Sequence, residues 1–186
     1  MANVNTADSP VNDAQLIALS ADLGAALKAR NCTLTLAESC TGGMLAQTIT
    51  SVAGSSAWFN TGFVTYSNAS KSTLLNVSKH VLTQHGAVSE QTALEMAKGA
   101  LKVAASIDKT SSTLSPTIIA ASITGIAGPD GGTLSKPVGT VCFAFAQASH
   151  CFSSTQLFKG DRENIRKQST EYALKQLLQL TLTIEI

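Results

Sequence analysis

The chain of 186 residues carries little charge: Asp, Glu, Lys and Arg make up 13% of it, and the formal net charge at pH 7 is +1. Its few Lys and Arg residues are scattered, without a basic stripe or interleaved aromatic residues. A nucleic-acid-binding surface needs concentrated positive charge, so nucleic acid is excluded as the expected partner. Apolar residues make up 44% of the chain, which excludes a disordered protein and favours a compact one with a substantial core.

Cysteine and histidine are sparse as well. Cys32, Cys40, Cys142 and Cys151 lie far apart without C-x-x-C spacing, and the three histidines form no ligand cluster. We therefore expect neither a metal site nor disulfides. The first residues lack the features of a signal peptide, and no run of about 18 apolar residues exists that could span a membrane. These absences predict a protein of the reducing cytoplasm, with no membrane partner.

The pattern of apolar residues predicts a flexible N-terminal tail (residues 1–12) followed by one domain (residues 13–186). A polar stretch at 108–116 is expected to be a surface loop. Helices are expected over 12–30, 42–52, 68–77, the segment after Gly86 and 161–180, and strands over 33–39, 58–67, 117–126, 138–147 and 150–158. This order, with its terminal hairpin, predicts a layered α/β domain with the sheet inside and helices outside.

The sequence "ESCTGG" stands where the first strand gives way to a helix. Ser39 is thus expected at the carboxyl end of a strand, where α/β sheets bind ligands. Gly42 and Gly43 open the next helix, and free backbone N–H groups there favour an anion. A hydroxyl beside such donors suits acyl transfer, in which the oxygen attacks a carbonyl and the N–H groups hold the resulting oxyanion. The alternative interpretation is an ordinary helix cap and tight turn.

A serine nucleophile needs a base. The histidines are expected in a polar connection and a hairpin turn, without a carboxylate partner, so Lys71 is the better candidate. Burial disfavours a charged ammonium, which allows a lysine to act as a base, and Tyr66 would orient or relay the proton. The alternative is that Lys71 is a solvated helix lysine. Cys40 remains a possible nucleophile, although a small buried cysteine is more frequent.

Two further features stay open. Glu38 is either a hydrogen-bond acceptor supporting the site or an ordinary carboxylate near a helix cap. The sequence "GIAGPDGG", which contains Gly125, Gly128 and Asp130, matches neither G-x-G-x-x-G nor a P-loop. It predicts either a loop whose backbone cradles a phosphate or sugar, or a plain turn.

Five blocks in order carry a resemblance to a known family. They are "AESCTGG", "GSSAWFNTGFVTYSNASK", "HGAVSE", "SITGIAGPDGG" and "KPVGTV". Together they resemble the CinA C-terminal domain family, and in particular its stand-alone nicotinamide-nucleotide amidases. The likeness extends from about Asp13 to Gln179, nearly the whole chain, and no motif position departs from the family pattern.

The resemblance implies a three-layer α/β/α sandwich with a mixed central sheet. It also implies hydrolysis of the carboxamide of nicotinamide mononucleotide (NMN), without a metal or organic cofactor. The nucleophile would be Ser39, with Lys71 and Tyr66 as the other catalytic residues. The oxyanion would be held by backbone N–H groups near Thr41, Gly42 and Gly43. Weaker candidates for ribose or phosphate contacts are Gly125, Gly128, Asp130, Thr140 and Arg162.

Several alternatives accompany this hypothesis. Arg162 and Arg166 form either a phosphate clamp or a solvated helix face. The chain is either an amidase for NMN, an amidase or esterase for another small substrate, or a nucleotide-binding module without catalysis. A homodimer is expected, since the apolar surplus and helix stripes permit one.

Overall fold

The computed structural model describes residues 11–107, 116–148 and 150–184. The expected tail lies outside the described residues except for its last two, and the expected loop at 108–116 lies outside them except for Pro116. Within the described ranges, no helix combines the length and apolarity needed to cross a bilayer.

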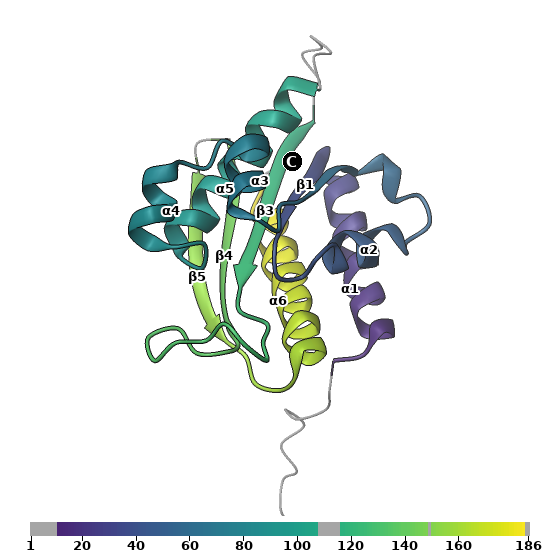
Figure 1. Cartoon of the computed structure of the whole chain (residues 1–186). Coiled ribbons are helices and arrows are strands. Elements are labelled where there is room, and N and C mark those ends of the chain that lie inside the picture. Colours follow the sequence, from purple (N-terminus) through teal and green to yellow (C-terminus); the bar gives the residue numbers. More distant parts are fainter. Residues whose placement is uncertain (1–10, 108–115, 149, 185–186) are drawn as a thin grey trace, which may run out of the picture.

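Five strands form one mixed sheet in the order β2-β1-β3-β4-β5 (Figure 1). The strands are β1 (Cys32–Glu38), β2 (Phe59–Val64), β3 (Thr117–Gly125), β4 (Thr140–Gln147) and β5 (His150–Leu157). The first three pair in parallel, whereas β3, β4 and β5 pair antiparallel, which is the expected terminal hairpin.

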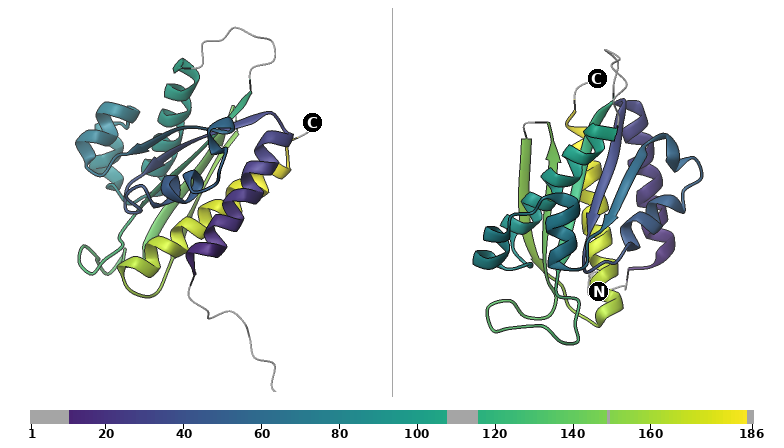
Figure 2. Two further views of the ribbon diagram at one scale, coloured as in Figure 1. Left: turned by 90° about the vertical axis from the view of Figure 1, so that its right-hand side faces the viewer. Right: turned by 45° about the horizontal axis from the view of Figure 1, so that its top comes forward.

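Helices cover both faces of this sheet, so the predicted three-layer arrangement is confirmed (Figure 2). On one face lie α1 (Asp13–Ala29), α2 (Met44–Thr50) and α6 (Arg162–Leu182), with α1 and α6 side by side. On the other lie α3 (Asn68–Leu75), α4 (Lys79–His85) and α5 (Glu90–Ile107). The larger apolar side chains, including Trp58 and Phe143, fill the layer toward α1 and α6. The helix expected after Gly86 is α5, and its buried Ala93 and Ala97 let it approach the sheet closely.

One helix was not expected from the sequence. Residues around His80 and His85 were interpreted as a polar connection, but they form α4. The helix has seven residues, none of them buried, so it lacks the apolar stripe that would have indicated it. The feature of the sequence that indicates this helix is its N-cap, Ser78, whose hydroxyl accepts hydrogen bonds from the N–H groups of His80 and Val81.

The order of the strands determines where a ligand can bind. From β1 the chain crosses to β2 on one side, and after β2 it returns to β3 on the other side of β1. The carboxyl ends of β1 and β3 therefore flank a point where the direction of winding reverses, the usual place for a binding crevice in an open α/β sheet. The sequence "ESCTGG" ends β1 at this crevice.

Candidate active site

Ser39 continues β1 by one residue. Its N–H donates to the carbonyl oxygen of Ile123 on β3 at 2.9 Å, and on the other side the Thr65 N–H donates to the carbonyl of Glu38 at 2.8 Å. The sheet thus holds the serine backbone from both neighbouring strands. Its side chain is 8% exposed and lines a pocket, as the strand-end argument predicts.

Lys71 reaches this serine from α3. The helix begins at a capping box in which Ser67 and Ser70 exchange hydrogen bonds, and Lys71 follows directly. Its side chain is only 1% exposed, and Nζ donates to Ser39 Oγ at 3.0 Å and to the carbonyl oxygen of Thr65 at 2.8 Å. The structure therefore brings the predicted pair together across 32 residues of sequence and contradicts the alternative of a solvated lysine.

Burial gives this lysine the property a base requires. Loss of hydration lowers the pKa of the Lys71 ammonium below its ordinary value of 10.5, an effect partly opposed by the Cys40 sulfur. A neutral amine has two N–H groups and one lone pair. With one N–H held by the Thr65 carbonyl, the lone pair is available to accept the hydroxyl proton of Ser39.

The Glu38 carboxylate lies at the start of α2, which decides between its two interpretations. Its carboxylate, 1% exposed, accepts hydrogen bonds from the N–H groups of Gly43, Leu45 and Ala46 at 3.0, 3.2 and 2.8 Å. A negative group there satisfies the otherwise unpaired amides of a helix start and complements the helix dipole. Glu38 is therefore the cap of α2, supplied from the strand.

This cap changes which amides a substrate can meet. The Gly43 N–H is taken by Glu38, and the Gly42 N–H donates to the carbonyl of Ser39 at 3.0 Å. In the described part of the chain, the N–H groups of Cys40 and Thr41 have no carbonyl or carboxylate acceptor. The donors available beside Ser39 thus lie one to two residues after it, earlier than the glycines suggested.

A second cation fixes this corner from α6. The guanidinium of Arg166 donates to the carbonyl oxygen of Thr41 through Nη2 at 2.6 Å and Nε at 3.2 Å. Its sequence context had suggested a phosphate clamp or a solvated helix face. Its actual place could not be predicted, because the approach of α6 to the corner depends on packing of the whole layer.

Cys40 is a poor nucleophile in this setting. Burial, with a smaller contribution from Glu38, raises the pKa of its thiol to about 12. The thiolate is the reactive form of cysteine, so at neutral pH the side chain stays protonated and inert. Cys40 belongs to the core cluster and also lines the pocket above Ser39.

The pocket above Ser39 has a volume of about 270 Å³. It is lined by both members of the pair and by four of the predicted contact residues, namely Gly125, Gly128, Asp130 and Arg162. Thr124, the last buried residue of β3, also lines it and was missed, although its place at a strand end was a signal. No group of three His, Cys, Asp or Glu side chains suited to a metal ion occurs among the residues described.

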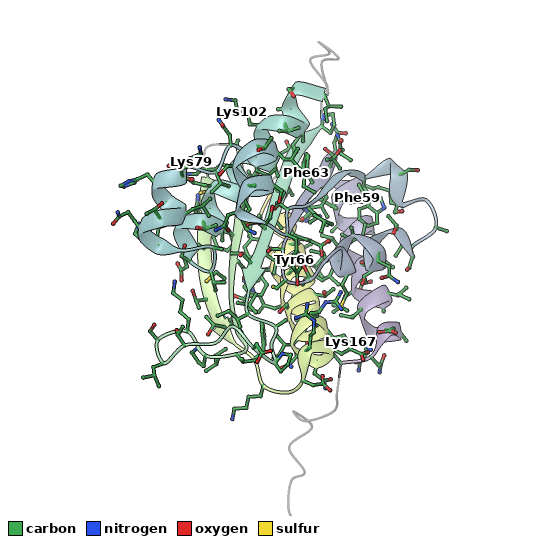
Figure 3. The ribbon with its side chains drawn as sticks, viewed as in Figure 1. Phe59, Phe63, Tyr66, Lys79, Lys102 and Lys167 are labelled. Carbon is green, nitrogen blue, oxygen red and sulfur yellow. The ribbon has the colours of Figure 1, made fainter. Side chains whose placement is uncertain are left out.

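Arg162 and Tyr66 form one edge of this pocket. The guanidinium donates to the carbonyl of Gly128 through Nη1 at 2.8 Å and to the phenol oxygen of Tyr66 through Nη2 at 2.9 Å. Tyr66 is 59% exposed and lies apart from Phe59 and Phe63 of β2 (Figure 3). Its hydroxyl faces Arg162, whereas Lys71 contacts Ser39 directly.

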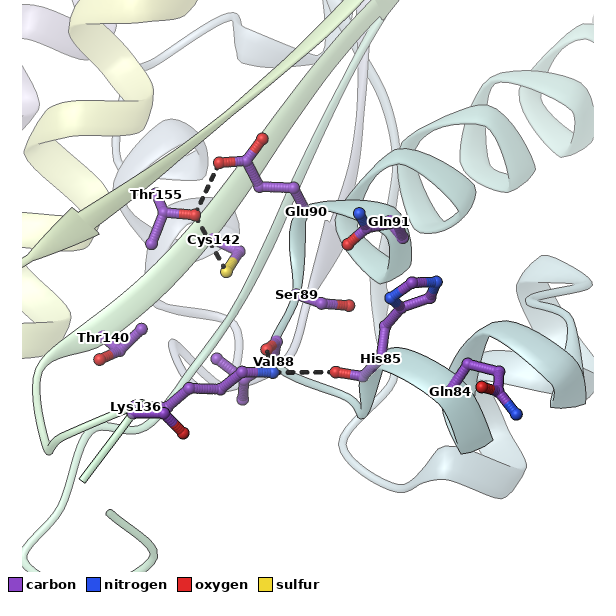
Figure 4. A pocket seen from close by; sticks show the side chains of 11 residues that line it. Gln84, His85, Val88, Ser89, Glu90, Gln91, Lys136, Thr140, Cys142 and Thr155 are labelled. Atoms are coloured by element: carbon purple, nitrogen blue, oxygen red, sulfur yellow. Dashed lines mark hydrogen bonds between the residues drawn. The ribbon is translucent and has the colours of Figure 1, made fainter. Parts of the chain in front are cut away.

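Of the five residues expected to contact the ribose or phosphate, Thr140 is the one that does not line this pocket. It lines a neighbouring pocket of about 500 Å³ (Figure 4). Its hydroxyl donates to the carbonyl oxygen of Pro137 at 2.7 Å. The two pockets share Val88.

Comparison with known proteins agrees with this geometry. The model of the CinA C-terminal domain matches residues 16–181. The chain belongs to the CinA C-terminal domain family. It is 53% identical over 170 residues to the nicotinamide-nucleotide amidohydrolase PncC of Escherichia coli K12, covering 91% of this chain and 96% of that one.

Two further members support the assignment. The protein of the same name from Pseudomonas putida is 45% identical over 162 residues, covering 87% of this chain and 94% of the relative. The crystal structure of the competence damage-inducible protein A from Klebsiella pneumoniae superposes with a TM-score of 0.82 at 35% identity, covering 91% of this chain and 99% of that one. The CinA C-terminal fold thus extends over almost the whole described domain.

Replacing Glu38 tests its role as the cap of the corner. Glu38→Gln leaves one buried amide N–H without an acceptor and places an NH₂ group among donors, so we expect a loss of about 1–3 kcal/mol in the free energy of unfolding. Urea unfolding measures it. As a control, Glu171→Gln removes a partly exposed ion pair with Lys175, whose side chains are 26% and 55% exposed, and should cost less than about 1 kcal/mol. Equal effects of the two substitutions would contradict the assigned role.

The lowered pKa of Lys71 predicts a pH dependence of stability. An unfolded lysine binds a proton below about pH 10.4, whereas the folded protein keeps Lys71 neutral down to a lower pH. Between these limits the unfolded state binds more protons, so stability rises with pH. The free energy of unfolding of the wild type minus that of Lys71→Met should therefore increase with pH, with a slope of up to about 1.4 kcal/mol per unit. A difference that stays flat across urea unfolding series at several pH values would show that Lys71 titrates normally.

Proposed function

We propose that this chain hydrolyses the carboxamide of NMN to nicotinate mononucleotide and ammonia. The observation that carries the proposal is the 3.0 Å hydrogen bond between the buried Lys71 Nζ and Ser39 Oγ. Such a pair supplies a nucleophile and its base without a cofactor. The substrate is suggested by the names of relatives about 50% identical over nearly the whole chain.

In the first step the neutral amine of Lys71 takes the hydroxyl proton as Ser39 Oγ attacks the carboxamide carbon. The carbonyl oxygen becomes an oxyanion, which the N–H groups of Cys40 and Thr41 stabilise; one such donor is worth about 3 kcal/mol of barrier. The Lys71 ammonium then returns its proton to the leaving nitrogen. The carbon–nitrogen bond breaks, ammonia departs, and the nicotinoyl group remains esterified to Ser39.

In the second step a water molecule takes the place of ammonia. Lys71 accepts its proton as the water oxygen attacks the ester carbon, and the same amides hold the second oxyanion. The bond to Ser39 Oγ breaks, the serine recovers its proton from Lys71, and nicotinate mononucleotide leaves. Tyr66 acts in this scheme by orienting Arg162, with which it shares a hydrogen bond.

The charges of the pocket suggest how the nucleotide lies. With Lys71 neutral, Arg162 is the cation that lines the pocket in the described part of the chain, and Asp130 is the carboxylate. A phosphate is attracted to the guanidinium and repelled by the carboxylate. The phosphate is therefore assigned to Arg162, and Asp130 is left to accept hydrogen bonds from the ribose hydroxyls. The homodimer and the cytoplasmic location expected from the sequence stay predictions.

Substitution of the pair tests the mechanism. We expect Ser39→Ala and Lys71→Met each to reduce kcat by about 10⁴-fold or more, because the two groups act as a unit. Cys40→Ala serves as the matched control and should retain kcat within about tenfold, since its thiol takes no part. Ammonia release from NMN measures all three, and mass spectrometry of acid-quenched enzyme should find the nicotinoyl adduct on Ser39. Robust release by Ser39→Ala would refute the nucleophile, and no release by the wild type would favour a binding module.

Substitution of Arg162 tests how the phosphate is recognised. Arg162→Met should lower kcat/KM for NMN by about 10- to 100-fold, because a charge-assisted contact to the phosphate is lost. The rate with nicotinamide riboside, which lacks the phosphate, should change much less. Arg162→Lys should restore part of the preference. An equal loss on both substrates would mean that Arg162 acts through Tyr66 and Gly128 rather than on the phosphate.

A further inference from the structure

Two segments without regular structure wall the catalytic pocket. The connection between α4 and α5 contributes Ala87 and Val88, and the loop after β3 contributes residues 126–128, 130 and 131. Segments of this kind have no helix or sheet ladder of their own to fix their position. The shape of the pocket therefore depends on what holds the two walls in place.

The carbonyl groups of residues 85–88 show how the first wall is held. In the described part of the chain all four accept hydrogen bonds from side chains and none from a backbone amide. The hydroxyls of Ser89 and Thr92 donate to the carbonyl of Gly86 at 3.1 and 2.7 Å. The hydroxyl of Thr124 on β3 donates to that of Ala87 at 2.8 Å.

Lys136 supplies the remaining two bonds. Its Nζ donates to the carbonyl oxygen of His85 at 2.9 Å and to that of Val88 at 2.6 Å, and Figure 4 shows the side chain extended toward this connection. Hydrogen bonds from an ammonium are shorter and stronger than those between neutral groups. Lys136 thus holds both ends of the connection.

The same lysine belongs to the second wall. It lies on the loop after β3, where its N–H donates to the Thr133 hydroxyl at 3.0 Å and its carbonyl accepts from the Thr133 N–H at 2.8 Å. Its backbone is therefore fixed to the loop while its side chain crosses to the α4–α5 connection. Lys136 lines the neighbouring pocket and not the one above Ser39.

We propose that Lys136 is a positioning residue that ties the two walls of the catalytic pocket together and so sets how tightly substrate is held. It touches neither Ser39 nor Lys71, so its loss loosens the walls and leaves the chemistry intact. The identity of the substrate in this proposal rests on the proposed function, whereas the connection of the two walls by Lys136 does not.

The test compares Lys136→Met with the wild type in NMN hydrolysis. Met keeps the length of the side chain and removes the donors, so we expect KM to rise about tenfold with kcat changed less than about twofold, the signature of lost uniform binding. Lys136→Arg, which can still donate to both carbonyls, should restore KM to within about threefold of the wild type. Lys98→Met on the exposed face of α5 is the matched control and should leave both constants unchanged.

Hydrogen exchange provides a second readout that does not depend on activity. In Lys136→Met, peptides covering residues 85–89 and 126–132 should exchange faster, while those from α1 and α6 should not change. A wild type without amidase activity would refute the proposed function and leave the tie to be judged by exchange alone. Unchanged KM and exchange, a fall in kcat at constant KM, or a Lys136→Met protein that does not fold would each overturn the proposal.

Discussion

The site depends on one buried amine. Burying a charged ammonium costs several kcal/mol even after the surroundings relax, so burial favours the neutral amine and lowers the pKa of Lys71. The fold provides Lys71 with two hydrogen-bond partners, the carbonyl of Thr65 and the hydroxyl of Ser39. Both come from the carboxyl edge of the parallel part of the sheet, so the pairing of β1 with β2 also brings Lys71 and Ser39 together.

A second constraint is how the backbone N–H and carbonyl groups of the corner after β1 are bound by charged side chains. The start of α2 attracts negative charge, and a substrate anion would compete for it if it were free. The Glu38 carboxylate at the end of β1 accepts hydrogen bonds from the N–H groups at the start of α2, so that helix start is already occupied by a group of the protein itself. Arg166 then holds the Thr41 carbonyl from the opposite helix. The Glu38 carboxylate fixes one end of the short segment and the Arg166 guanidinium fixes the other. The amides of Cys40 and Thr41, which bind no carbonyl, are therefore held in a defined direction, and preorganised donors of this kind are what oxyanion stabilisation requires.

The sequence predicted what local patterns and strand ends determine. Among the described residues, period and capping signals located ten of the eleven helices and strands other than the short 3-10 turn, and the carboxyl end of β1 predicted the place of Ser39. The pairing with Lys71 came from residue chemistry and the family resemblance. Two kinds of contact could not be predicted. One is the choice of acceptor within a turn, since the Gly43 N–H donates to the Glu38 carboxylate. The other is the packing of distant segments, which sets the position of Arg166 and separates Thr140 from the pocket above Ser39. A glycine pair indicates freedom of the backbone but does not say which acceptor its amides meet.

Hydrogen bonds from two basic side chains explain how loops can form the walls of a small pocket. The guanidinium of Arg162 donates to the carbonyl of Gly128 and to the hydroxyl of Tyr66, and the ammonium of Lys136 donates to the carbonyls of His85 and Val88. Each cation thus stabilises a wall, but only Arg162 lines the pocket above Ser39. The guanidinium has five N–H donors, and two of these hydrogen bonds fix its plane while the others remain for a ligand. Four basic side chains thus take four separate places: Lys71 beside Ser39, Arg166 on the Thr41 carbonyl, Lys136 on the α4–α5 connection and Arg162 at the edge of the pocket. In the proposed function, the phosphate of the nucleotide is therefore recognised by Arg162 alone.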